Sequence, residues 1–161
     1  MLKNMKANDF IISKTNVKGQ ITYVNKIFME MAEYDESELL GKPHNIIRHP
    51  DMPKAVFKLL WEMVQKGEEI FAYVINKTKN GNDYWVYANI TPSYDRSGNI
   101  IGYYSVRRMP NQSALDIIKP LYSSMLNAER SGGVNAGTKI LTDLLYEKGA
   151  TYNELIISIQ G

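Results

Sequence analysis

The stretch that governs the predicted fold runs from Ile70 to Arg107 and reads IFAYVINKTKNGNDYWVYANITPSYDRSGNIIGYYSVR. Residues 70–77, 84–91 and 100–107 are rich in β-branched and aromatic side chains, which is typical of strands. Asn80-Gly81 favours a tight hairpin turn between the first two segments, and Asp95-Arg-Ser-Gly98 favours a second turn. This part of the chain therefore predicts three consecutive antiparallel strands.

The residues upstream of this stretch predict two more strands and several short helices. Residues 10–14 and 20–24 are apolar and β-branched, and Lys18-Gly19 between them predicts a hairpin turn. Asn25 is placed to cap a short helix through Met31, and residues 35–38 have the Asp-x-x-Glu form of a capping box. Pro53 suits the first turn of a longer helix with an apolar face. The order predicts an α+β domain, in which short helices cover one face of a five-stranded antiparallel sheet.

The sequence pattern changes from strand-like to helical beyond Pro110. Residues 114–130 and 134–148 have helical patterns separated by Ser131-Gly-Gly133, and Thr151-Tyr-Asn-Glu154 is a capping-box pattern that opens a last short helix. We expect residues 9–110 to form the folded domain and residues 111–161 to form a C-terminal helical extension. These helices pack either on the domain or against a partner, because the last one is too short to be stable alone.

Composition excludes several classes of function. The chain has 161 residues, 44% of them hydrophobic, and a net charge of +2, which gives no electrostatic basis for binding nucleic acid. It has no cysteine, so disulfides, thiolate metal sites and cysteine nucleophiles are excluded. Neither a signal peptide nor an apolar run of about 18 residues is present, which predicts a cytoplasmic protein without direct membrane insertion. The absence of a nucleophile–base set or of metal-ligand spacing argues against an enzyme.

Reactive side chains gather in one segment, Pro43-His-Asn-Ile-Ile-Arg-His-Pro-Asp-Met-Pro53. It contains both histidines of the chain, His44 and His49, with Arg48 and Asp51 beside the second one. Such a segment could bind an anionic or redox-active ligand, and the planar fork of an arginine suits a pyrophosphate. The alternative is a structural turn, in which His49 and Asp51 only cap helices and Arg48 pairs with a carboxylate.

The order of elements and several motifs resemble a PAS domain. The segments Gly41–Pro53, Lys79–Val86 and Gly102–Arg107, followed by Ile-Lys-Pro-Leu-Tyr122, are similar to the flavin-binding PAS domain of bacterial aerotaxis receptors of the Aer type. The resemblance extends over about residues 9–130. The small size of the chain makes it most similar to single-PAS energy-taxis proteins of the CetB type, which work with a separate membrane-bound transducer.

This resemblance implies noncovalent binding of FAD. The family motif associated with FAD corresponds here to His44, Arg48, His49 and Asp51. Three further positions match family residues: a strand asparagine that bonds the isoalloxazine edge, an asparagine at the pocket mouth, and a tryptophan suited to stacking or electron transfer. These are Asn76, Asn25 and Trp61. A strand-end role for Asn76 and a core role for Trp61 stay open as structural alternatives.

The chain also departs from its flavin-binding relatives. The family has a tryptophan at the position of Ile70, and the light-sensing flavin domains have a reactive cysteine that this chain lacks. Alternation along the strands places Asn76 on the inward face with Ile70, Ala72 and Val74. The opposite face of the next strand carries three side chains that we expect to contact a partner. They are Trp85, Tyr87 and Asn89.

Three functions from different classes compete at this point. The resemblance favours a redox or energy-taxis sensor that holds FAD and signals its redox state to a membrane-bound chemotaxis transducer, through the outer sheet face and the C-terminal helices. Such a protein would be cytoplasmic, held at the inner membrane by its partner. The alternatives are a haem-binding gas sensor with His44 or His49 as axial ligand, and a cofactor-free interaction module. A homodimer is possible by analogy with other PAS domains.

Overall fold

A computed structural model describes residues 1–161 and has at its centre a five-stranded antiparallel sheet of order β2-β1-β5-β4-β3. The strands are β1 (Ile11–Asn16), β2 (Ile21–Val24), β3 (Ile70–Lys77), β4 (Asp83–Tyr94) and β5 (Ile100–Arg108). The last strand lies between β1 and β4, so it joins the N-terminal hairpin to the β3–β4 hairpin. The predicted α+β class and the five antiparallel strands are confirmed.

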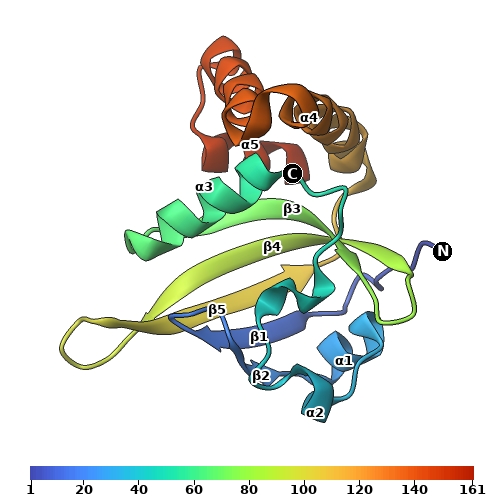
Figure 1. The fold of residues 1–161 in the computed structure, drawn as a ribbon, viewed down its shortest axis with the longest axis vertical. Coiled ribbons are helices and arrows are strands. Elements are labelled where there is room, and N and C mark those ends of the chain that lie inside the picture. Colours follow the sequence, from blue (N-terminus) through green and yellow to red (C-terminus); the bar gives the residue numbers. More distant parts are fainter.

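Helices lie on both sides of this sheet, as Figure 1 shows. They are α1 (Lys26–Ala32), α2 (Glu36–Leu39), the 3-10 turn η1 (His44–Ile47), α3 (Lys54–Gln65), α4 (Gln112–Lys148) and α5 (Tyr152–Gln160). The predicted caps are present: Asn25 accepts a hydrogen bond from the Phe28 amide, and Asp35 and Glu38 form a capping box. No helix is long and apolar enough to cross a membrane.

The predicted break between the first two C-terminal helices is a kink at a single residue. Gly133 has φ 73° and ψ −168° inside α4, and every other residue of that helix keeps helical dihedrals. This combination of dihedrals is open essentially to glycine alone. The two arms of α4 therefore meet at Gly133, and we call them together the C-terminal hairpin (residues 112–148).

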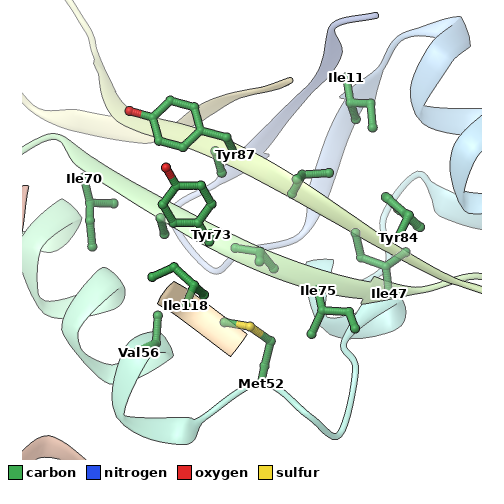
Figure 2. Packing of buried hydrophobic residues seen from close by; sticks show 14 of the residues in the cluster. Ile11, Ile47, Met52, Val56, Ile70, Tyr73, Ile75, Tyr84, Tyr87 and Ile118 are labelled. Atoms are coloured by element: carbon green, nitrogen blue, oxygen red, sulfur yellow. The ribbon is translucent and has the colours of Figure 1, made fainter. Parts of the chain in front are cut away.

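The C-terminal helices occupy the outer face of β3 and β4. Tyr87 is only 4% exposed there, and its ring lies 5.2 Å from that of its cross-strand neighbour Tyr73 (Figure 2). The Tyr122 hydroxyl on α4 donates to the Tyr73 carbonyl over 2.6 Å, and its ring lies 6.0 Å from that of Trp85. The expectation that Trp85, Tyr87 and Asn89 form a free partner surface is thus corrected. Tyr87 is buried, Trp85 is half-buried against Tyr122, and the half-buried Asn89 donates to Glu69 Oε1 over 2.9 Å. Burial of this aromatic face inside the chain is the physical reason.

The sheet also requires one close backbone approach. A Cβ atom on Gly102 would lie 2.1 Å from the carbonyl oxygen of Thr15 on the neighbouring strand. Only glycine leaves room for β5 to pair with both β1 and β4 at this level, where it lies opposite Asn16 and Ser93. The inner face of the sheet beyond this point forms one wall of a cavity.

Candidate functional site

A cavity of about 460 Å³ lies between the inner face of the sheet, η1 and α3. The sheet contributes polar side chains, and α3 contributes an apolar wall. The residues that line it are Ser13, Thr15, Lys18, Gly19, Pro43, His44, Asn45, Ile47, Arg48, Phe57, Leu60, Trp61, Val64, Val74, Asn76, Ala88, Ile90, Tyr103, Ser105 and Arg107. An apolar pocket with a few convergent polar groups is typical of a small-molecule site.

Strand alternation positions the polar groups of the sheet wall. Val74 and Asn76 face inward from β3, as the sequence predicts, and Ser105 and Arg107 face inward from β5. Arg107 lies opposite Ala88 in the β4–β5 register, and the small side chain of Ala88 leaves the guanidinium access to the cavity. The inner face of β3 and β5 therefore carries the Asn76 amide, the Ser105 hydroxyl and one cation, Arg107.

Arg107 is the dominant charge of the site. It is 5% exposed, and its Nη2 donates to Ser13 Oγ over 3.0 Å and to His44 Nε2 over 2.7 Å. No carboxylate forms a salt bridge with it, and its Nη1 has no hydrogen-bond partner. Burial lowers the pKa of Arg107 to about 10, so the guanidinium keeps its charge at neutral pH.

His44 is held neutral beside this cation. Burial lowers the pKa of His44 to about 3, and the charge of Arg107 acts in the same direction. Because Arg107 can only donate, His44 Nε2 must accept, which leaves the ring proton on Nδ1. The ring also meets Phe28 edge-on at 5.8 Å. Of this buried pair, only Arg107 is therefore charged.

Three buried polar atoms in this wall have no partner within the chain. They are Arg107 Nη1, Asn76 Nδ2 and Ser105 Oγ. An unsatisfied buried donor costs roughly 1–3 kcal/mol, and more when it is charged, so such atoms are rarely kept without a function. Their shared position fits a bound polar ring with several hydrogen-bond acceptors and at least partial negative charge.

The rim of the cavity carries a second arginine and an aromatic pair. Arg48 is exposed to solvent, and its guanidinium lies 4.2 Å above the Phe57 ring of α3. Its backbone bridges to Asn76 on β3, which ties the His44–Asp51 segment to the sheet. Trp61 is 37% exposed and meets Tyr103 edge-on at 5.3 Å. Arg48 can thus contact an anionic group of a ligand that extends out of the cavity.

Three of the predicted site residues do not line the cavity. His49 Nε2 bonds Asp83 Oδ1 over 2.8 Å, and its Nδ1 accepts from the Asp51 amide over 2.9 Å. The Asp51 side chain is 70% exposed. Asn25 bonds the Ile12 amide over 3.0 Å and the Phe10 carbonyl over 2.8 Å. The structure therefore brings together His44, Arg48, Asn76 and Trp61, and it engages the other three in local contacts.

Sequence reasoning missed Arg107 and its partner Ser13. The signal was present, because alternation from Tyr103 through Ser105 places Arg107 on the inward face of its strand. A charged residue at an inward position is unusual and points to a ligand or an ion pair. No group of three or more histidine, aspartate or glutamate side chains is placed to hold a metal ion. Ile70 is fully buried and lies outside the cavity wall.

A five-stranded antiparallel sheet with a cavity between its inner face and a helix is the arrangement found in one family of domains. The family model described as the PAS fold matches residues 21–107. This chain belongs to the PAS-fold family.

Comparison with characterised proteins gives a more specific likeness. The chain is 42% identical over 121 residues to the aerotaxis receptor of Escherichia coli K12, and the match covers 75% of this chain and 24% of that protein. It is 25% identical over 97 residues to the nitrogen fixation regulatory protein of Klebsiella pneumoniae, over 60% of this chain and 20% of that one. The chain thus spans about a quarter or less of these relatives.

Solved structures share the fold. A light-oxygen-voltage domain studied with a flavin analogue superposes with a TM-score of 0.57 at 26% identity, over 73% of this chain and 86% of that chain. The PAS domain of the fruit-fly ELK potassium channel superposes with a TM-score of 0.56 at 16% identity, over 62% of this chain and 85% of that chain. The resemblance to PAS domains is therefore confirmed in both sequence and fold.

Proposed function

We propose that this chain is a redox sensor that binds FAD noncovalently in the cavity and reports the flavin's redox state to a chemotaxis transducer. One observation carries the proposal: a buried guanidinium without a carboxylate, Arg107, lies beside two further unpaired polar atoms in the wall of the cavity. The likeness to an aerotaxis receptor and to a flavin-containing light-oxygen-voltage domain supports it.

The residues present fit a flavin. When bound, FAD supplies reversible electron transfer, and the protein holds and tunes it. Asn76, Ser105 and Arg107 offer donors to the polar edge of the isoalloxazine ring, and Phe57, Leu60 and Val64 on α3 give the ring an apolar wall. A fixed positive charge favours a ligand that gains negative charge, so Arg107 favours the reduced cofactor. Arg48, at the rim, is placed to bind the pyrophosphate.

His49, Asp51 and Asn25 have indirect roles in this proposal. His49 bonds Asp83 on β4 and the Asp51 amide, so it fixes the backbone that follows Arg48. Asn25 joins β1 to the start of α1. We infer that these residues maintain the shape of the FAD site and that they affect FAD through Arg48 and His44.

Haem is disfavoured by the histidine geometry. Ligation of haem through His44 Nε2 would break its 2.7 Å contact with Arg107, and His49 uses both ring nitrogens within the chain. Either ligation would leave a buried donor or a carboxylate without its partner.

The proposed partner contact involves the C-terminal helices. Their outer surface exposes Ile117, Tyr146 and Ile157, which are 49%, 90% and 48% accessible. A membrane-bound transducer that binds there would place this protein in the cytoplasm beside the inner membrane.

The visible absorption spectrum of the purified protein tests the cofactor. Flavin gives bands near about 370 and 450 nm and haem a single intense band near about 400 nm, whereas a cofactor-free module absorbs at neither.

Arg48→Ala should lower FAD affinity by roughly tenfold or more, because a charge-assisted bond to the pyrophosphate is lost. Arg96→Ala, in the exposed turn between β4 and β5, is the matched control. An FAD affinity in Arg48→Ala equal to that of the wild type would refute the assignment of Arg48.

A further inference from the structure

The helix α3 adjoins both the cavity and the His44–Asp51 segment. Its side chains Phe57, Trp61 and Val64 face the cavity, and its N-terminus follows directly after the His44–Asp51 segment. Pro53 occupies the N-cap position and makes no side-chain cap bond. The first amide groups of α3 therefore need an acceptor from another part of the chain.

Glu129 in the C-terminal hairpin supplies that acceptor. Its Oε1 accepts from the Lys54 amide over 2.9 Å, and its Oε2 accepts from the Ala55 amide over 3.1 Å. These contacts span 75 and 74 residues of sequence. A carboxylate at this position also interacts favourably with the positive end of the helix dipole. One side chain of α4 thus replaces the local cap that Pro53 lacks.

The second arm of the hairpin fixes the position of Glu129. A Cβ atom on Gly137 would lie 2.3 Å from Glu129 Oε2, 2.7 Å from its Cγ and 2.9 Å from its Cδ. Gly137 is buried, and the kink at Gly133 turns its arm back toward Glu129. The carboxylate is therefore enclosed by the start of α3 on one side and by the returning arm of α4 on the other.

We propose that Glu129 is a positioning residue that couples α3, the apolar wall of the cavity, to the C-terminal hairpin. A shift of α3 changes the two amides that hold the carboxylate, and the carboxylate in turn determines how closely the arm at Gly137 can approach. Coupling of this kind is reciprocal, so the hairpin also affects α3. An effect of FAD on the hairpin through Glu129 rests on the function proposed above.

Hydrogen exchange on the FAD-free protein tests whether Glu129 holds the first amides of α3. Gly137→Ala places a methyl group against Glu129, and Glu129→Gln removes its charge and one of its two acceptor oxygens. Both variants should speed exchange of the Lys54 and Ala55 amides by between about two- and thirtyfold, the range expected for loss of a helix cap. Because alanine favours helix over glycine, Gly137→Ala does not weaken α4 through helix propensity. Glu147→Gln, which removes an exposed carboxylate from the same hairpin, is the matched control. Unchanged exchange at both amides would overturn the proposal.

A second measurement adds FAD. In the wild type, FAD should slow exchange across Gly133–Gly137, and in Glu129→Gln this protection should be lost while FAD is still bound. Persistence of the protection in Glu129→Gln would also overturn the coupling. If the wild type binds no FAD, the function proposed above fails, and the exchange rates of the FAD-free variants still decide whether α3 and the hairpin are coupled.

Discussion

The burial of Arg107 costs the folded domain free energy. Removing a cation from water costs several kcal/mol unless a counter-charge compensates it. Here the guanidinium has no carboxylate, and its contacts are with Ser13, the neutral ring of His44 and the face of Phe28, 5.5 Å away. A cost of this kind is commonly retained where a ligand offsets it. Arg107 should therefore stabilise the complex with FAD and destabilise the protein without it.

Replacement of Arg107 tests both effects, on the complex with FAD and on the protein without it. We expect Arg107→Met to bind FAD roughly tenfold to hundredfold more weakly, because a charge-assisted bond is lost. The same variant should be more stable than the wild type without FAD, by about 1–4 kcal/mol, because an uncompensated buried charge is removed. Fluorescence titration with FAD and urea unfolding measure the two effects. Arg107→Lys, which keeps the charge, is the control, and equal FAD affinity in Arg107→Met would contradict the assignment.

Glu33 joins the end of α1 to the turn between β3 and β4. It follows α1 with a left-handed φ of 63°, and its carboxylate accepts from the side chains of Asn80 and Asn82 in the β3–β4 turn. Hydrogen bonding to Thr78, and then to these two amides, lowers the pKa of Glu33 from 4.5 to about 2. The helix and the turn are thus held together by an ionised carboxylate.

This contact predicts a pH dependence of stability. A carboxylate with a depressed folded-state pKa stabilises the fold fully above its unfolded pKa of 4.5, and this contribution is lost as the pH falls toward about 2. The free energy of unfolding of Glu33→Gln should therefore be lower than that of the wild type at pH 7, and the difference should shrink between pH 4.5 and 2. The effect should be smaller than the pKa shift alone implies, because Glu33 is partly exposed and screened by solvent. Urea unfolding at several pH values measures it, with Glu147→Gln as the control, and a difference that does not depend on pH would contradict the role given to Glu33.

At the scale of the whole molecule, α5 closes both an edge and a face of the sheet. β3 is an edge strand, and Asn153 of α5 accepts from the Phe71 amide over 3.0 Å and donates to the Glu69 carbonyl over 2.9 Å. The Tyr73 hydroxyl donates to Gln160 Oε1 over 2.9 Å on the outer face. Satisfying edge groups in this way suppresses pairing with other chains.

Removal of the Asn153 side chain should therefore have two consequences. We expect Asn153→Ala to lower the free energy of unfolding by about 1–3 kcal/mol, since a buried-edge amide loses its acceptor. The variant should also associate at high concentration through the uncovered edge of β3. Urea unfolding and light scattering measure these effects, with Ser158→Ala on the same helix as the control. A monomeric variant of wild-type stability would contradict this role for α5.

Much of the fold and part of the site follow from local patterns. The Asn80-Gly81 turn, the capping box at Asp35 and the alternation along β3 depend on interactions within a few residues, so they can be predicted from the sequence. The same alternation placed Asn76 in the cavity wall. His44 and Arg48 reached the cavity as expected because the short segment that contains them bridges to β3.

The five strands, their turns, the helix caps and the segment that supplies His44 and Arg48 can be predicted from the amino-acid pattern, because each depends on neighbours in the chain. The folded chain adds what the pattern does not contain: Arg107 meets His44, His49 bonds Asp83, Tyr87 is buried, and Glu129 caps α3. These contacts join distant residues, and they depend on how whole elements pack. Packing is the sum of many weak contacts that no single stretch of sequence encodes.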